Sequence, residues 1–374
     1  MTDRRTTITR LTSSAPAAIA VIELRGPKAF ELVQLHWSPM QGKPDLPVNR
    51  IRYGMFRSAT NDNSAVGESI VVVQRGPELF ELHCHGGQAA ALNILRTLID
   101  EGAQEVSRQE WIHRQATDRI AAEATEDILH TTTVRTASIL MDQVRGALDY
   151  VWTQIEGHVK TGQLAEARRI ADNVLRWSDV GLHLIHPWRV VLCGPPNVGK
   201  SSLLNRLLGY TRAVVHAEAG TTRDLLAEST SIDGWPVTLI DSAGVRESEH
   251  EVESLGIKRA RQAMATADRL LLLIDPKEGW TEEHQAIWNS HSGRCLLVQT
   301  KSDKNATTTS PSDLPSMASS VSAVNGAGIE ELLQTISRSL VPNPPSAGIA
   351  VPFRSWHLEK LAQLLAGEES RSAE

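Results

Sequence analysis

The sequence is poor in cysteine and in long apolar runs. Its 374 residues hold three cysteines, Cys84, Cys193 and Cys295, two of them in predicted core strands, which argues against a disulfide framework and for a reducing compartment. No window approaches the roughly 20 apolar residues of a membrane helix, and Arg4 and Arg5 are not followed by the apolar segment of a secretory signal. We therefore expect a cytoplasmic protein without membrane contact.

An excess of basic charge is also absent. The formal net charge is -6, so any RNA contact would need a local basic patch. The content of 41% hydrophobic and 22% charged residues is ordinary for a globular chain. The length leaves room for two or three domains.

Residues 1–105 predict an α+β domain. Apolar or alternating segments indicate strands at 18–24, 51–56, 68–74 and 79–83, and helices at 28–35 and 88–100. The run His83-Cys84-His85 could suggest a metal site. Neighbouring strand residues point to opposite faces, however, and no second Cys/His pair has ligand spacing, so a strand-to-helix turn is the favoured interpretation.

Residues 106–186 predict a helical domain. Proline is absent between Pro77 and Pro187, and apolar residues recur at helical spacing, as in Ile139, Leu140, Val144 and Leu148. The pattern indicates three or so bundled helices, with breaks at Gly162 and at 178–179.

The stretch Gly194-Pro195-Pro196-Asn197-Val198-Gly199-Lys200-Ser201 matches the phosphate-loop pattern G-x-x-x-x-G-K-S. An apolar run at 189–193 precedes it, and helical spacing at 202–208, closed by Gly209, follows it. Backbone N–H groups, the helix N-terminus and Lys200 suit phosphate oxygens, and Ser201 offers a hydroxyl to Mg²⁺. A nucleoside triphosphate is the expected ligand.

Two later motifs fit the γ-phosphate end. Residues 220–224 lie where a first switch is expected, and Thr222 could complete the Mg²⁺ shell when a γ-phosphate is present. Asp241 ends a strand at 235–240 and could hold Mg²⁺ through water, while the Gly244 N–H could meet the γ-phosphate. The predicted phosphate-binding residues are Asn197, Val198, Gly199, Lys200, Ser201, Ser202, Thr221, Thr222, Asp241 and Gly244.

The segment Thr300-Lys301-Ser302-Asp303 follows a predicted buried strand and points to guanine. An aspartate at 303 can accept hydrogen bonds from guanine N1 and N2, a donor pair that adenine lacks, and the Lys301 stem can cover the base. The usual first residue is Asn rather than Thr300, so some loop-bracing hydrogen bonds are expected to be lost. The loop at 322–328 completes a predicted guanine contact set of Thr300, Lys301, Asp303, Ser322 and Ala323.

These motifs, in this order on alternating strands and helices, predict a GTP-binding domain at about 187–342 with a mostly parallel sheet. Val245 and Arg246 follow Gly244, and no glutamine occurs before Gln262. Ras-like GTPases place the attacking water with a glutamine in this region. Here that group must come from elsewhere.

The phosphate-loop and switch sequences, together with the segments 251–257 and 81–87, resemble the MnmE (TrmE) family of tRNA-modification GTPases over nearly the whole chain. The resemblance implies a multidomain fold of α/β and α parts. Its domains would be a folate-binding-like α+β domain at 1–105, the first part of a helical domain at 106–186, an inserted P-loop GTPase domain at 187–342, and a C-terminal helix at 343–374 that completes the helical domain.

The resemblance also implies a Mg²⁺-dependent, K⁺-stimulated GTPase, activated by dimerisation and expected to form a homodimer. Asn197 matches a K⁺ ligand, with the loop 215–222 closing over the cation, and Glu253 matches the catalytic glutamate that orients water. The alternatives are a loop-bracing side chain at Asn197 and an ordinary solvated helix carboxylate at Glu253.

Two features depart from the family. A one-carbon tetrahydrofolate is implied for the N-terminal domain, where Glu81 matches a contact, but Glu23 stands where an arginine is expected and reverses the local charge. No cysteine lies in 353–374, where the family has a Cys-x-Gly-Lys tail.

Two hypotheses about function follow. In one, the chain works with a flavin-dependent partner to modify the wobble uridine of tRNA, which the order of the domains favours. In the other, it is a divergent GTP-regulated switch acting on ribosome assembly or another partner without tRNA-modifying chemistry, which the missing tail favours.

Overall fold

A computed structural model describes residues 5–15, 17–42, 45–58, 67–211, 227–242, 252–304 and 319–366. The chain forms two compact units, Met1–Thr117 and Asp118–Glu374. Within the described residues, no helix is both long and apolar enough to cross a membrane.

The first unit is built on a seven-stranded sheet in the order β3-β4-β5-β6-β2-β1-β7. Its neighbouring strands are antiparallel except for the β1–β7 pair. The strands are β1 (Thr7–Arg10), β2 (Ile19–Arg25), β3 (Trp37–Pro39), β4 (Ile51–Phe56), β5 (Glu68–Gly76), β6 (Leu79–His85) and β7 (Gln104–Glu105). The sequence predicted β2, β4, β5 and β6 to within a few residues, but missed the short strands β1, β3 and β7.

Helices α1 (Ala29–His36) and α2 (Gln88–Asp100) share a hydrophobic core with alternate residues of the strands, among them Ile22, Leu24 and Leu82. The opposite face carries Glu23, which lies directly across from Glu81 in the β2–β6 register. A third helix, α3 (Arg108–Gln115), begins at the capping side chain of Ser107. Its Trp111 Nε1 donates to Glu23 Oε1 at 2.8 Å.

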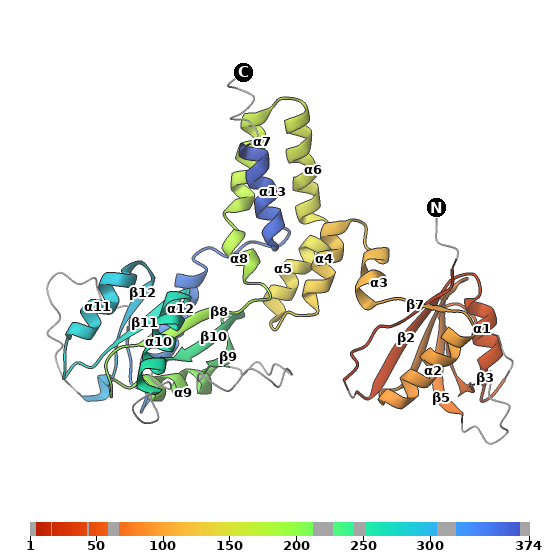
Figure 1. Cartoon of the computed structure of the whole chain (residues 1–374), viewed down its shortest axis with the longest axis horizontal. Coiled ribbons are helices and arrows are strands. Elements are labelled where there is room, and N and C mark those ends of the chain that lie inside the picture. Colours follow the sequence, from red (N-terminus) through yellow and green to blue (C-terminus); the bar gives the residue numbers. More distant parts are fainter. Residues whose placement is uncertain are drawn as a thin grey trace. The chain divides into compact units, whose positions relative to one another are not determined.

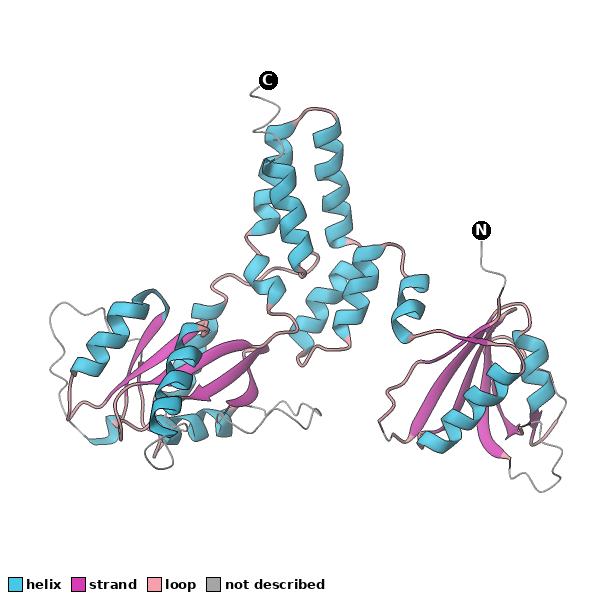
Figure 2. Cartoon of the chain, viewed as in Figure 1, coloured by secondary structure: helices cyan, strands magenta, loops and turns pink. Residues whose placement is uncertain are grey.

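Residues 118–187, all of which the structure describes, contain helices and no strand (Figure 2). The helices are α4 (Arg119–Ile128), α5 (Val134–Val144), α6 (Ala147–Lys160), α7 (Leu164–Leu175) and α8 (Ser178–Leu182). The prediction of three or so helices was too low, because caps divide the apolar stripe. Asp118 and Thr133 accept backbone N–H groups at the starts of α4 and α5, and Gly146 precedes α6 at φ +94°.

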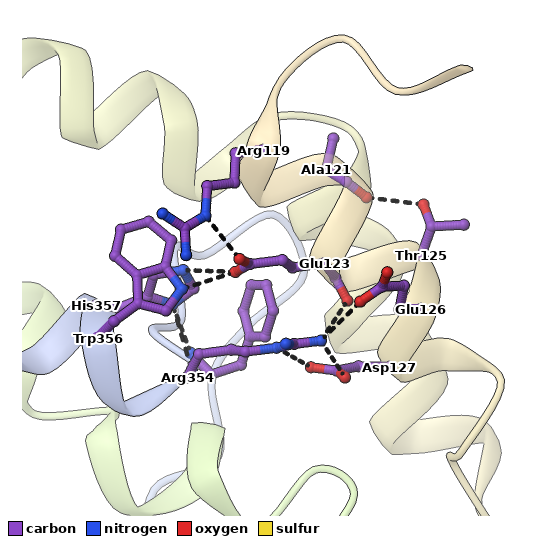
Figure 3. Close-up of polar contacts among 10 residues, drawn as sticks. Arg119, Ala121, Glu123, Thr125, Glu126, Asp127, Arg354, Trp356 and His357 are labelled. Atoms are coloured by element: carbon purple, nitrogen blue, oxygen red, sulfur yellow. Dashed lines mark hydrogen bonds and ion pairs between the residues drawn. The ribbon is translucent and has the colours of Figure 1, made fainter. Parts of the chain in front are cut away.

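The segment after residue 342 returns to these helices. Helix α13 (Ser355–Ala366) lies beside α7 (Figure 1). Arg354 makes a two-pronged contact with Asp127 of α4, through Nε to Oδ2 at 3.0 Å and Nη2 to Oδ1 at 2.7 Å (Figure 3). Glu123 accepts from Trp356 Nε1 and from Arg119 Nε, each at 2.8 Å. Paired Arg–carboxylate contacts set geometry as well as charge, so this network holds α13 against α4.

The remaining part of the second unit is a six-stranded sheet in the order β13-β12-β11-β8-β10-β9. All its neighbours are parallel except the β9–β10 hairpin, so the prediction of a mostly parallel sheet is confirmed. The strands are β8 (Trp188–Cys193), β9 (Ala227–Ile232), β10 (Trp235–Asp241), β11 (Arg269–Ile274), β12 (Cys295–Gln299) and β13 (Ser319–Ser320).

Helices cover both faces of this sheet. Helices α9 (Lys200–Tyr210) and α12 (Ile329–Leu340) share a core with Val190 and Leu192 of β8. Helices α10 (Val252–Ala265) and α11 (Glu282–His291) share one with Val191 and Cys193. Burial on both faces explains the continuous apolar runs of β8 and β11. Gly209 was expected to close the helix after the phosphate loop, but α9 continues through it to Tyr210.

The network around α13 predicts a pH dependence of stability. His357 is fully buried, and its Nδ1 accepts the backbone N–H groups of Phe353 and Arg354 at 3.3 Å. Burial lowers the pKa of His357 from 6.5 to about 4, even though Glu123 opposes the shift. Between those two values the unfolded chain binds a proton that the folded chain does not, so stability falls as the pH falls from 6.5 toward 4, by up to about 3 kcal/mol.

Urea unfolding at pH 7 and pH 4.5, followed by circular dichroism, checks this expectation. His357→Gln should lose much of the difference between the two pH values, whereas the same change at exposed His130 should keep it. An unchanged pH dependence in His357→Gln would contradict the assignment.

Candidate guanine-nucleotide site

The phosphate loop leaves the central strand β8 and enters α9. Gly194 has a φ of +129°, and a Cβ there would lie 2.7 Å from the carbonyl oxygen of Leu273, so the backbone passes too close to β11 for a side chain. Asn197 and Gly199 also have left-handed φ values, +60° and +103°. These conformations curl the loop back toward the N-terminus of α9.

Lys200 lies inside this curl. Its side chain is buried, and Nζ donates to the carbonyl oxygens of Gly194 and Pro195, both at 2.7 Å. A full positive charge is thus held beside the first turn of α9, where the backbone N–H groups lack helical partners. The arrangement favours a polyanion.

Ser201 and Asp241 meet across the loop. Ser201 Oγ donates to Asp241 Oδ2 at 2.5 Å, and Asp241, the last residue of β10, is fully buried. A hydroxyl and a carboxylate oxygen are the hard donors that Mg²⁺ prefers. The two residues proposed from the sequence for the cation end of the site therefore lie together.

Thr300 follows β12 and braces the phosphate loop. Its Oγ1 lies 2.8 Å from the carbonyl oxygen of Val198 and 3.3 Å from that of Ile274. The sequence predicted some loss of bracing where Thr replaces Asn. The hydroxyl nevertheless bonds directly to the phosphate loop.

Lys301, at φ +53°, crosses to the same loop. Its Nζ donates to the carbonyl oxygen of Asn197 at 2.8 Å and to Asp275 Oδ2 at 2.5 Å. Asp275 follows the last residue of β11 and was not singled out in the sequence. Its position directly after a buried parallel strand, where ligand sites gather, was the available signal.

Asp303 is oriented by the last loop. The buried Ser322 donates from Oγ to Asp303 Oδ1 at 2.7 Å and accepts the N–H groups of Val324 and Asn325, both at 3.3 Å. The hydrogen bond from Ser322 holds the pKa of Asp303 below its usual value. The carboxylate is therefore ionised and can accept hydrogen bonds from a base.

A pocket of about 140 Å³ lies between the phosphate loop, the 300–304 segment and the loop after β13. Its lining includes most of the residues predicted from the sequence to contact guanine and some of those predicted to bind the phosphates. Its lining comprises Val198, Gly199, Ser202, Leu203, Thr300, Lys301, Asp303, Lys304, Val321, Ala323 and Val324. A second hollow of about 260 Å³ lies beyond Lys200, against α10 and α11.

Comparison with known proteins agrees with this geometry. The family model described as "GTP-binding protein TrmE N-terminus" matches residues 6–118, and that described as "50S ribosome-binding GTPase" matches 189–301. The tRNA modification GTPase MnmE of Moorella thermoacetica is 30% identical, over 91% of this chain and 83% of its own length. That of Synechococcus sp. strain WH7803 is 32% identical, over 89% and 81%. The chain belongs to the MnmE family.

As an MnmE-family GTPase, the chain hydrolyses GTP to GDP and phosphate, and Mg²⁺ is the cofactor that this family membership implies. A solved structure of Aquifex aeolicus Era bound to GDP·AlF₄⁻ has a more limited similarity. It is 26% identical and covers 42% of this chain and 57% of its own, with a TM-score of 0.30.

Several residues assigned to the MnmE-type mechanism lie outside the described parts of the chain. They are Thr221 and Thr222 of the first switch, and Gly244 of the second. Glu253 belongs to α10, whose backbone is described at that position while the side chain is not.

The N-terminal residues suggested for folate are already engaged within the first unit. Glu23 is buried and holds Trp111 Nε1 and Arg25 Nε. Glu81 accepts from Arg75 Nη2 at 3.0 Å and lies 3.2 Å from His83 Nε2; the hydrogen bond from Arg75 lowers its pKa against the effect of burial. A buried carboxylate at position 23 cannot make the anion contact that an arginine makes, so these residues do not fit the folate site expected from the family.

Proposed function

We propose that the chain couples GTP hydrolysis to modification of the wobble uridine of tRNA, acting in the cytoplasm with a flavin-dependent partner. The observation that carries this proposal is that two family models match the chain, the TrmE N-terminal model over 6–118 and the GTPase model over 189–301. The alternative, a divergent GTP-regulated switch without tRNA-modifying chemistry, gives no reason for the match over 6–118. Relatives named tRNA modification GTPase align over most of their own length.

In this proposal the phosphate loop binds the triphosphate through the N–H groups of 197–202 and through Lys200. Ser201 and Thr222 hold Mg²⁺, with Asp241 acting through a water, and Gly244 meets the γ-phosphate. Asp303 reads the guanine edge, supported by Ser322 and Ala323, while the Lys301 stem covers the base and Thr300 braces the loop. The contacts among Lys200, Ser201, Asp241, Thr300, Lys301, Asp303 and Ser322 support this assignment. One-carbon tetrahydrofolate is not part of the proposal, because Glu23 does not suit it.

Glu253 is proposed to orient the attacking water, since Val245 stands where a glutamine would serve. Its place near the start of α10, directly after the second switch, supports the role.

Glu253→Ala should therefore lower the turnover number for GTP by roughly 10²- to 10⁴-fold, the range for a lost acid–base or water-orienting group. The dissociation constants for GTP and GDP should change little, because the proposed role of Glu253 is to orient the attacking water and not to bind the nucleotide. Single-turnover hydrolysis and equilibrium titration with a fluorescent GDP measure the two effects. Glu282→Ala on α11 is the matched control, and wild-type turnover in Glu253→Ala would remove the assignment.

A K⁺ ion bound by Asn197 is proposed to supply positive charge near the phosphates, as an arginine finger does elsewhere. The side chain of Asn197 is exposed, and it makes no hydrogen bond to another described residue. This supports a ligand role over the alternative of bracing the loop. A homodimer is proposed as the active form. The face of the first unit's sheet opposite α1 and α2 supports it by presenting the largely exposed side chains of Ile19, Ile51 and Tyr53.

Replacing Na⁺ by K⁺ at equal ionic strength should raise GTP turnover, and turnover per chain should rise with chain concentration in K⁺ if G domains pair. Asn197→Gly removes the side chain without straining a φ of +60°. It should abolish the difference between the two salts while leaving GDP affinity near wild type. Equal rates of the unaltered chain in both salts would contradict the K⁺ role.

The tRNA role is tested by nucleoside analysis of tRNA from cells lacking the gene. Wobble uridines should lose their modification, and the intact gene should restore it. A gene carrying Lys200→Ala, which removes the phosphate-binding ammonium, should not. Normal wobble uridines in the deletion strain would overturn the proposed function while leaving GTP hydrolysis in place.

A further inference from the structure

Asp275 lies at the edge of the guanine pocket without lining it. It follows β11, and its two carboxylate oxygens have different partners. Oδ1 accepts the backbone N–H of Lys277 at 2.9 Å, within its own turn. Oδ2 accepts from Lys301 Nζ at 2.5 Å, and Lys301 lies 26 residues further along the chain.

The Asp275–Lys301 pair is partly withdrawn from water. The Asp275 side chain is 7% exposed and that of Lys301 is 30% exposed. Burial alone would raise the pKa of Asp275, but the hydrogen bond from Lys301, with that from Lys277, outweighs it and the net pKa is lowered. A charged carboxylate thus faces a charged ammonium at a site with little access to water. If one partner were removed, water could not readily take its place beside the other.

The same ammonium also donates to the carbonyl oxygen of Asn197. Two fixed acceptors, one on the phosphate loop and one after β11, therefore determine where the end of the Lys301 side chain lies. A lysine stem has four rotatable bonds and considerable rotamer entropy. Fixing its far end at two points holds the methylene groups of Lys301 along the wall of the pocket, which Lys301 lines.

We propose that Asp275 is a positioning residue of the guanine site, which acts by holding the Lys301 stem over the face of the base. The inference rests on the guanine site assigned under the proposed function. Asp275 does not touch the nucleotide. It sets guanine affinity through Lys301 and leaves the chemistry at the γ-phosphate unchanged.

If Asp275 had a purely structural role, it would act through Oδ1, which accepts the backbone N–H of Lys277 and closes the turn. A double-mutant cycle separates the two roles. Asp275→Ala should raise the dissociation constants of GDP and GTP by the same factor, roughly 10- to 100-fold, the effect of losing a hydrogen bond between charged groups. The turnover number at saturating GTP should stay at the wild-type value, so the change appears in KM.

In a chain that already carries Lys301→Ala, adding Asp275→Ala should weaken GDP binding no further. Asp275→Asn keeps an acceptor oxygen without the charge, and should lie between wild type and Asp275→Ala. Additive losses in the double variant, or wild-type GDP affinity in Asp275→Ala, would overturn the proposal.

Two further measurements complete the test. Glu278→Ala removes an exposed carboxylate from the same turn and should leave GDP affinity unchanged. Asp303→Asn should shift preference from guanine toward xanthine nucleotides, whereas Asp275→Ala should weaken both classes equally, because the Lys301 stem contacts the base face rather than its edge. A wild-type chain that bound ADP as tightly as GDP would refute the guanine site itself, an outcome distinct from the failure of Asp275 alone.

Discussion

The nucleotide site depends on one constraint, the parallel direction of the central strands. Because β8, β10, β11 and β12 run the same way, the loops after them emerge at one edge of the sheet. Asp241, Asp275 and Thr300 lie at or directly after a strand end at this edge, and Lys200 begins α9 after the loop that follows β8. The absence of a Cβ on Gly194 lets the phosphate loop pass against β11, and the other loops are tied to it from that position.

Hydrogen bonds between loops convert this shared edge into a defined pocket. Thr300 and Lys301 bond to the carbonyl oxygens of Val198 and Asn197, so the guanine segment and the phosphate loop hold each other. Ser322 then orients Asp303 from a third loop. Each contact joins residues far apart in sequence, and the pocket has its shape only when all three loops are in place.

A similar long-range closure holds the rest of the second unit together. The chain passes from helices α4–α8 into the GTPase domain after α8. It returns to these helices at Arg354, which pairs with Asp127 of α4 at a separation of 227 residues. Glu123 of α4 accepts hydrogen bonds from Trp356 of α13 and from Arg119 (Figure 3). The carboxylates of α4 therefore bind both Arg354 and the first turn of α13. Helices α4 and α13, which lie on either side of the GTPase domain in the sequence, are therefore bonded to each other.

Local patterns were enough to predict the GTPase fold, but they did not single out Asp275 directly after β11. Strand, glycine-bounded loop and helix form a short-range signal, and apolar runs mark strands buried on both faces. The helices between 118 and 187 were predicted less well. Apolar residues recur at helical spacing on both sides of caps such as Thr133, so the breaks between helices do not stand out in the sequence. The short strands β1, β3 and β7 were missed because two to four residues carry too little pattern to register.

Sequence motifs alone therefore predicted a phosphate loop, an aspartate at 303 proposed to bind guanine, and a resemblance to a GTPase family that the comparisons confirm. The side chains that support those residues became known from the folded structure. Asp275 partners Lys301, the Thr300 hydroxyl braces the phosphate loop, and Glu23 holds Trp111 rather than an anion. The physical reason is that a motif depends on neighbours in the chain, whereas a hydrogen bond depends on distances between atoms that folding alone brings together.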